Sequence, residues 1–164
     1  EMAEQLRSED KSKYNKRNHE LLKEHIAKGL EQAYTNMNNS IFAETKYYIE
    51  YMEMRKQQSK VLYEMYDKIK TLTMVTPQGE EIAELMIYVT NTLFESQNAK
   101  ILIQREYELL SKFQKDSLPV TRDEFENRAI LYMILMDLLL FLKIKEEFAD
   151  SLTDHQKKLY WSNR

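Results

Sequence analysis

The chain has 164 residues, enough for one domain with a sizeable buried core. Two glycines and two prolines provide little material for turns, which argues against an all-β fold and favours an all-α one. The net charge of −3 comes from interspersed acidic and basic residues, which argues against a nucleic-acid partner, and the absence of cysteine excludes disulfides and thiolate chemistry.

The first predicted element is a helix over about residues 3–37. Its early part is polar and basic, and further on Leu22, Ile26 and Leu30 recur at the spacing that gives a helix one apolar face. Because the chain opens with Glu1 instead of methionine and continues with polar helix formers, we expect it to be a piece of a longer protein.

The second and third predicted helices cover about residues 41–72 and 77–115. The second follows a heptad rhythm whose apolar face also carries the polar residues Arg55 and Ser59. The third is predicted as one long helix that ends before Pro119, since proline disfavours helical geometry in the residue before it.

Helix starts are the sharpest local signals in the chain. Ser40 and Thr76 are predicted N-caps, because their side-chain oxygens can accept a hydrogen bond from a free backbone amide of the first turn. Thr121 and Glu124 form a predicted capping box for the fourth helix. A second box at residues 153–156 predicts a short final helix that carries the last aromatic residues.

The fourth predicted helix spans about residues 121–148. Val120 and Phe125 stand at the two positions of a hydrophobic staple. Residues 130–142 are apolar on every face except at Asp137, so we expect this helix in the middle of the fold. The apolar run extends for about 20 Å against a hydrocarbon core of about 30 Å, so we interpret it as a core helix and not as a membrane span.

Four long helices with short connections predict an all-α fold, an elongated antiparallel four-helix bundle about 45 Å long with a short C-terminal helical tail. We expect one domain over residues 1–164. Residues 1–18 would form a polar linker or helix start, residues 19–152 the bundle, and residues 153–164 the tail.

The sequence contains no pattern typical of catalysis. Bundle di-iron sites need Glu-x-x-His pairs, and none of His19, His25 and His155 has a glutamate three residues before it. The zincin pattern and the Gly-rich phosphate loop are also missing from the sequence. We therefore expect no catalytic residue, no metal and no cofactor.

Polar residues on apolar helix faces are more informative. Asp137 has only apolar neighbours on its own helix, so a partner must come from another one. If the second and fourth helices run in the same direction, Arg55 stands at the same level as Asp137, with Gln97 and Asn98 nearby on the third helix. We hypothesise a polar layer of these four residues. It could be a register-setting ion pair, an aspartate that reaches solvent, or a ligand-binding pocket.

A second polar group opens the fourth helix. An acidic residue here, such as Glu126, complements the positive end of the helix dipole, and Arg128 can pair with Glu124 one turn earlier. The whole group is Glu124, Phe125, Glu126, Asn127 and Arg128.

The segment LPVTRDEFENRAILYMILMDLLLFLKIKEEF at 118–148, together with YMEMRKQQSKVL at 51–62, resembles the C-terminal domain of the putative aromatic acid exporter family of Gram-positive bacteria. EFENRA, followed by DL, FL and IK at helical spacing, carries most of the resemblance, which extends over most of the chain. The resemblance implies a helical domain at the cytoplasmic face of the cell membrane, attached to a block of transmembrane helices that precedes it and would be its first partner.

Two roles follow from that resemblance and stay open. The domain could assemble, as a homo-oligomer or with other chains, through an exposed apolar strip or the tail at residues 159–161. It could instead sense a ligand, an aromatic carboxylate held by Arg55 against Tyr and Met side chains. The alternative without the resemblance is a stand-alone cytoplasmic interaction protein with no transport role, and a stand-alone enzyme would have only the polar layer in its favour.

Overall fold

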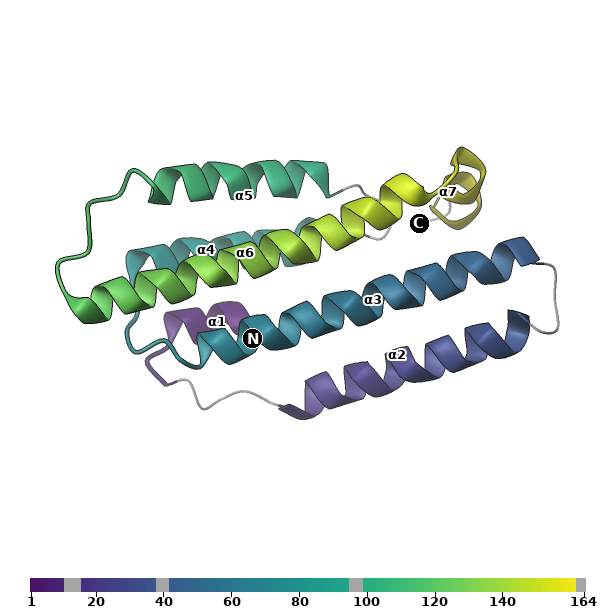
Figure 1. The fold of residues 1–164 in the computed structure, drawn as a ribbon, viewed down its shortest axis with the longest axis horizontal. Coiled ribbons are helices and arrows are strands. Elements are labelled where there is room, and N and C mark those ends of the chain that lie inside the picture. Colours follow the sequence, from purple (N-terminus) through teal and green to yellow (C-terminus); the bar gives the residue numbers. More distant parts are fainter. Residues whose placement is uncertain (11–15, 38–41, 95–98, 162–164) are drawn as a thin grey trace.

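The computed structural model describes residues 1–10, 16–37, 42–94 and 99–161. These residues form helices and contain no strand, so the predicted all-α class is confirmed. The fold is elongated, with the longest helices along its long axis (Figure 1). The helices are α1 (Met2–Arg7), α2 (Lys16–Met37), α3 (Phe42–Ile69), α4 (Pro77–Thr92), α5 (Lys100–Phe113), α6 (Arg122–Ser151) and α7 (Asp154–Trp161).

The two longest helices, α3 and α6, pack against each other along most of their length. Near one end the ring centroids of Tyr47 and Phe148 are 5.8 Å apart, and near the other Lys68 Nζ lies 2.7 Å from Asp137 Oδ2. As the residue number rises along α3, the number of the residue that it contacts on α6 falls. The two helices are therefore antiparallel.

The predicted helix over residues 77–115 is wrong as a single element, because α4 ends at Thr92 and α5 begins at Lys100. Leu93 leaves the helical region, with ψ of 82°. The last turn of α4 is weak helix-forming sequence, since Thr90 and Thr92 are β-branched and donate their hydroxyls to carbonyls four residues earlier.

The break turns α4 and α5 into a hairpin (Figure 1). Gln78 Nε2 lies 2.8 Å from Asp116 Oδ2, and the Arg105 guanidinium lies 3.9 Å from the centre of the Tyr88 ring, so the two helices run in opposite directions. This extra reversal explains why α6 is antiparallel to α3, where the sequence pattern predicted that they would be parallel.

The predicted helix over residues 3–37 is also divided. Ser8 ends α1 in an extended conformation, with φ of −102° and ψ of 140°, and its hydroxyl accepts a hydrogen bond from the amide of Asp10. One face of α1 is buried against α4, and Arg7 Nη2 lies 2.6 Å from Glu80 Oε1. The polar start of the chain is thus part of the bundle.

Three of the predicted helix starts are confirmed, and the Ser40 cap lies outside the described residues. In each case the threonine hydroxyl accepts from the amide three residues on, as local sequence chemistry requires. The pairs are Thr76 with Gly79 at 3.1 Å, Thr121 with Glu124 at 3.1 Å, and Thr153 with Gln156 at 3.2 Å. The predicted staple of Val120 and Phe125 is not buried, since both side chains are exposed.

The short helix α7 confirms the predicted tail and packs against the start of α3. The rings of Tyr160 and Tyr47 stack at 3.8 Å, with 7° between their planes. Trp161 Nε1 donates to Tyr47 Oη at 3.3 Å. Two of the three residues predicted as an interaction tail, Tyr160 and Trp161, thus contact their own chain, while Leu159 is exposed.

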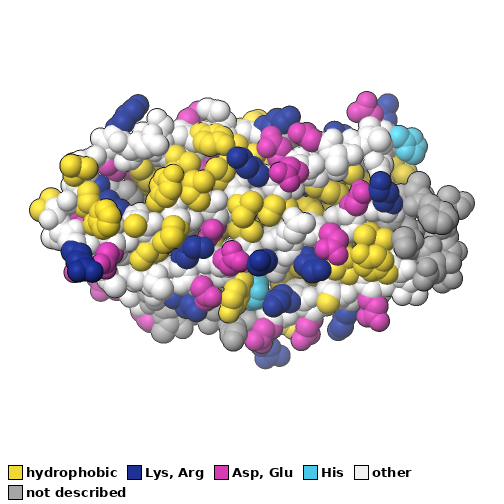
Figure 2. Space-filling view, viewed as in Figure 1, with side chains coloured by type: hydrophobic (Ala, Val, Ile, Leu, Met, Phe, Trp, Pro, Cys, Tyr) yellow, Lys and Arg dark blue, Asp and Glu magenta, His cyan; other side chains and the backbone are white. Residues whose placement is uncertain are grey.

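Helix α6 was expected in the middle of the fold, and this is only partly right. Its buried face packs against α3, α4 and α5, but four large apolar side chains on the opposite face are exposed. Figure 2 shows apolar side chains on the half of the molecule where the first part of α6 runs. Among the described residues, no helix combines the length and apolar character needed to cross a membrane. The exposed residues, called the α6 strip below, are Tyr132, Met133, Met136 and Leu140.

Glu106 lies at the centre of the buried face of α5, between Leu102 and Leu110. Its exposed fraction is 0%, and neither carboxyl oxygen has a hydrogen-bond partner in the part of the chain that the structure describes. Burial raises the pKa of Glu106 from its ordinary 4.5 to about 8, although the nearby backbone of Leu139 and the charge of Lys143, both on α6, work in the other direction. The carboxyl is therefore mostly protonated at neutral pH.

A carboxyl whose pKa is higher in the folded than in the unfolded chain binds its proton more tightly when folded. We therefore expect the free energy of unfolding to fall as pH rises from about 4.5 to about 8, by on the order of 4 kcal/mol for this group. Glu106→Gln, which is neutral at every pH, should remove this part of the pH dependence, measured by urea unfolding at several pH values.

The matched control is Glu108→Gln, two residues away on the exposed side of α5. It should keep the wild-type pH profile. If the free energy of unfolding of Glu106→Gln changed with pH in parallel with that of wild type, Glu106 would not be the group responsible.

Candidate functional site

The structure does not form the predicted Arg55–Asp137 pair. Asp137 Oδ2 instead lies 2.7 Å from Lys68 Nζ, and both side chains are partly buried. Arg55 is 13 residues before Lys68, which is about 20 Å along the axis of α3. The prediction is wrong because α3 and α6 are antiparallel. Residues equally far from the starts of these two helices therefore do not stand at the same level. Gln97 and Asn98 lie outside the described residues.

Arg55 lies on α3 among neutral polar groups. Its Nε donates to Tyr51 Oη at 3.1 Å, and its Nη1 lies 3.4 Å from Gln58 Oε1. Gln58 is itself buried, and its Nε2 donates to the carbonyl oxygen of Phe141 on α6 at 3.1 Å. These contacts fix the guanidinium relative to both long helices.

A hollow of about 290 Å³ opens beside Arg55, between α2, α3 and α6. Ser59 lines it with an exposed fraction of only 3%, and its hydroxyl has no hydrogen-bond partner among the described residues. A buried polar group without a partner is costly, and Ser59 places such a group in the wall of the hollow, with its oxygen almost completely covered. The lining residues are Leu22, His25, Ile26, Tyr51, Met52, Arg55, Gln58, Ser59, Leu62 and Phe141.

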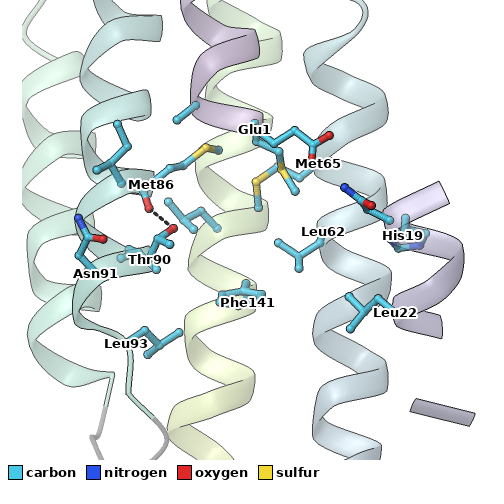
Figure 3. A pocket seen from close by; sticks show the side chains of 16 residues that line it. Glu1, His19, Leu22, Leu62, Met65, Met86, Thr90, Asn91, Leu93 and Phe141 are labelled. Carbon is cyan, nitrogen blue, oxygen red and sulfur yellow. Dashed lines mark hydrogen bonds between the residues drawn. The ribbon is translucent and has the colours of Figure 1, made fainter. Parts of the chain in front are cut away.

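A larger hollow of about 500 Å³ lies further along the same helices and also borders α1 and α4 (Figure 3). Its walls are mostly apolar, with Met65 and Leu62 from α3 facing Met86 from α4. At its edge, the His19 ring lies 4.8 Å from the Tyr63 ring, and burial, followed by the charge of Lys23, lowers the pKa of His19. His19 is therefore a neutral group at pH 7.

The group of residues 124–128 at the start of α6 holds two of the connections between helices. Asn127, with an exposed fraction of 2%, accepts from the amides of Thr73 and Met74 at 3.0 and 3.4 Å. Its Nδ2 donates to Thr73 Oγ1 at 2.7 Å and to the carbonyl of Asp123 at 2.8 Å. Three of these four hydrogen bonds tie the α3–α4 connection to α6, and the fourth lies within α6. This role of Asn127 was not predicted, because nothing local to the sequence identifies a partner 54 residues away.

Arg128 does the same for the α5–α6 connection. Its Nη1 donates to the carbonyl of Ser117, and the predicted pair with Glu124 is confirmed at 2.6 Å. Glu126 pairs with Arg122 at 2.7 Å on the surface, and Phe125 is exposed. The motif thus contributes hydrogen bonds that shape this end of the bundle.

Two residues with contacts to α6, Gln58 beside the smaller hollow and Lys68 opposite Asp137, were not predicted from the sequence pattern. Gln58 and Lys68 were missed because their partners are on α6, whose direction was predicted wrongly. Ser59 was within reach of prediction, since it stands on the same heptad face as Arg55. In the described ranges, no three His, Asp or Glu side chains come together as a metal ion would require.

Replacing Asn127 by alanine should remove all four hydrogen bonds and leave two backbone amides of the α3–α4 connection without their partner. We expect a loss of roughly 2–4 kcal/mol in the free energy of unfolding, measured by chemical denaturation. Asn91→Ala, a change of the same type at an exposed position of α4, is the control and should change stability by less than about 0.5 kcal/mol. A loss that small for Asn127→Ala would contradict the anchoring role.

Comparisons with known proteins agree with this arrangement. A crystal structure of a putative membrane protein from Clostridium difficile 630 superposes with a TM-score of 0.79 and 28% identity, over 92% of this chain and 89% of that one. The Bacillus subtilis (strain 168) protein "Uncharacterized protein YqjA" is 29% identical over 130 residues, which are 79% of this chain but only 39% of that protein. Residues 1–146 match the family described as "Putative aromatic acid exporter C-terminal domain". The chain therefore belongs to this family of exporter C-terminal domains.

Proposed function

We propose that this domain is a ligand-sensing regulatory module at the cytoplasmic face of the membrane, and that it binds an aromatic carboxylate beside Arg55. The family is described as an exporter domain and not as an enzyme, which favours a regulatory role over catalysis. The observation that carries the proposal is the hollow of about 290 Å³, in which Arg55 and the Ser59 hydroxyl meet apolar walls.

The chemistry of the hollow fits an aromatic acid. Apolar side chains such as Ile26, Met52 and Phe141 can cover a ring, and a guanidinium is the side chain best suited to bind a carboxylate. The volume lies close to the lower end of the range of about 300–1,000 Å³ for small-molecule sites, so this hollow could hold a small aromatic acid.

The test is calorimetric titration with benzoate, and with benzamide as its neutral analogue. Benzoate should bind and benzamide should not, because the charge is what Arg55 recognises. Arg55→Gln should weaken benzoate binding by roughly tenfold to a hundredfold, as for the loss of a charge-assisted hydrogen bond.

Ser59→Ala is the second variant, since it changes the hollow without removing a charge. Lys60→Gln is the matched control, because Lys60 stands on the same helix with a side chain that is 80% exposed. It should bind benzoate as wild type does. Equal affinity for benzoate and benzamide, or unchanged binding in Arg55→Gln, would overturn the proposal.

A second candidate function is assembly with another copy of this chain. The α6 strip favours it, because large apolar side chains on one face of a helix are typical of protein contact sites. Two copies could bury the strip in a symmetric pair of α6 helices.

If the strip forms this contact, the domain should dimerise in sedimentation equilibrium at concentrations of hundreds of micromolar. Met136→Lys and Leu140→Lys should each give a monomer, because the introduced charge would be buried at the centre of the contact. Leu159→Lys, which places the same charge at an exposed position of α7, is the control. A wild-type chain that stays monomeric would contradict assembly through α6.

A further inference from the structure

We propose that the two hollows act as one groove, and that the natural ligand is a carboxylate whose apolar body is longer than a single aromatic ring. An arylalkyl or fatty-acyl acid has this chemistry. The inference rests on the proposed function in one respect, that Arg55 binds the carboxylate.

The two hollows follow each other along the same pair of helices. On α3 the smaller hollow is lined from Tyr51 to Leu62, and the larger one from Leu62 to Met65. On α2, which is joined to α3 as an antiparallel neighbour, the lining residues run from Ile26 back to Asn18. The groove therefore extends over 15 residues of α3, which is about 20 Å.

The border between the hollows is made by three apolar side chains. Leu22, Leu62 and Phe141 line both hollows, one from each of α2, α3 and α6. In Figure 3, Leu62 and Phe141 stand side by side at the lower part of the larger hollow, with Leu22 across from them. An alkyl chain that leaves the Arg55 hollow would cross this apolar border and meet Met65 next.

The two hollows differ in charge. Arg55 lines the smaller hollow, whereas the larger one is lined mostly by apolar side chains. An anionic head group is attracted to the Arg55 end of the groove. A ligand with one charged end would therefore bind in a single orientation, with its tail between α3 and α4.

A single-ring acid would use only part of the groove. It would leave the larger hollow of about 500 Å³ empty, although this hollow alone has a volume typical of a small-molecule site. Each methylene group buried there should increase affinity by roughly fourfold, until the hollow is full.

The experiment compares benzoate, 4-phenylbutyrate and 8-phenyloctanoate by calorimetric titration, each below its micelle concentration. We expect the affinity to rise by more than a hundredfold from benzoate to 8-phenyloctanoate. Thr90→Trp, which places a large side chain at the exposed rim of the larger hollow, should remove most of that gain and leave benzoate binding unchanged. Glu84→Trp, on another face of α4, is the matched control and should bind all three acids as wild type does.

The outcomes separate this inference from the proposed function. If benzoate binds and the affinity does not increase with chain length, the groove proposal is overturned and the proposed function stands. If none of the three acids binds, both fail. If the long acid binds equally well to Arg55→Gln or to Thr90→Trp, its binding does not use the groove as described, and the groove proposal fails.

A last experiment distinguishes binding of a free acid from binding to a lipid surface. The domain should bind 8-phenyloctanoate in solution and should not sediment with phosphatidylcholine vesicles that contain oleate. Binding to the vesicles without binding to the free acid would assign the site to a membrane and overturn the proposal.

Discussion

The antiparallel packing of α3 against α6 is the constraint on which the rest of the structure depends. It brings Lys68 opposite Asp137, and it places the start of α3 where α7 can stack on Tyr47. It also lets Gln58 reach the carbonyl of Phe141, which holds Arg55 at the edge of a hollow. The direction of α6 follows in turn from the break between α4 and α5, because an additional reversal of the chain inverts every later helix.

Local sequence chemistry predicted the helix starts and the class of the fold, whereas the relative levels of the helices could not be predicted. A threonine and the amide three residues on are neighbours in any helix, so the caps at Thr76, Thr121 and Thr153 follow from the sequence alone. The breaks after Arg7 and Thr92 have weaker signals, a serine and two β-branched threonines, which packing can override. Missing one break was enough to assign Asp137 to the wrong partner.

In the candidate site, too, local patterns were predictable from the sequence, whereas the contacts between helices were not. The heptad pattern placed Arg55 and Ser59 on one face of their helix, and both line the smaller hollow, with Ser59 buried and Arg55 half-buried. The side chains opposite them depended on the direction of α6. The residues that carry the family resemblance most strongly, around Asn127 and Arg128, tie two connections to the bundle. Recognising the family from this motif therefore identified a helical domain, whereas the groove proposed to bind a ligand lies on another part of the molecule.

The carboxyl of Glu106 has a consequence for how the domain opens. The buried face of α5 has a group at its centre that water would solvate better than the core does. When this group is charged, less free energy is needed to separate α5 from the bundle, and the amide hydrogens of α5 should exchange faster. The bundle thus combines a tightly packed pair of long helices with one helix that a single lost proton helps to release.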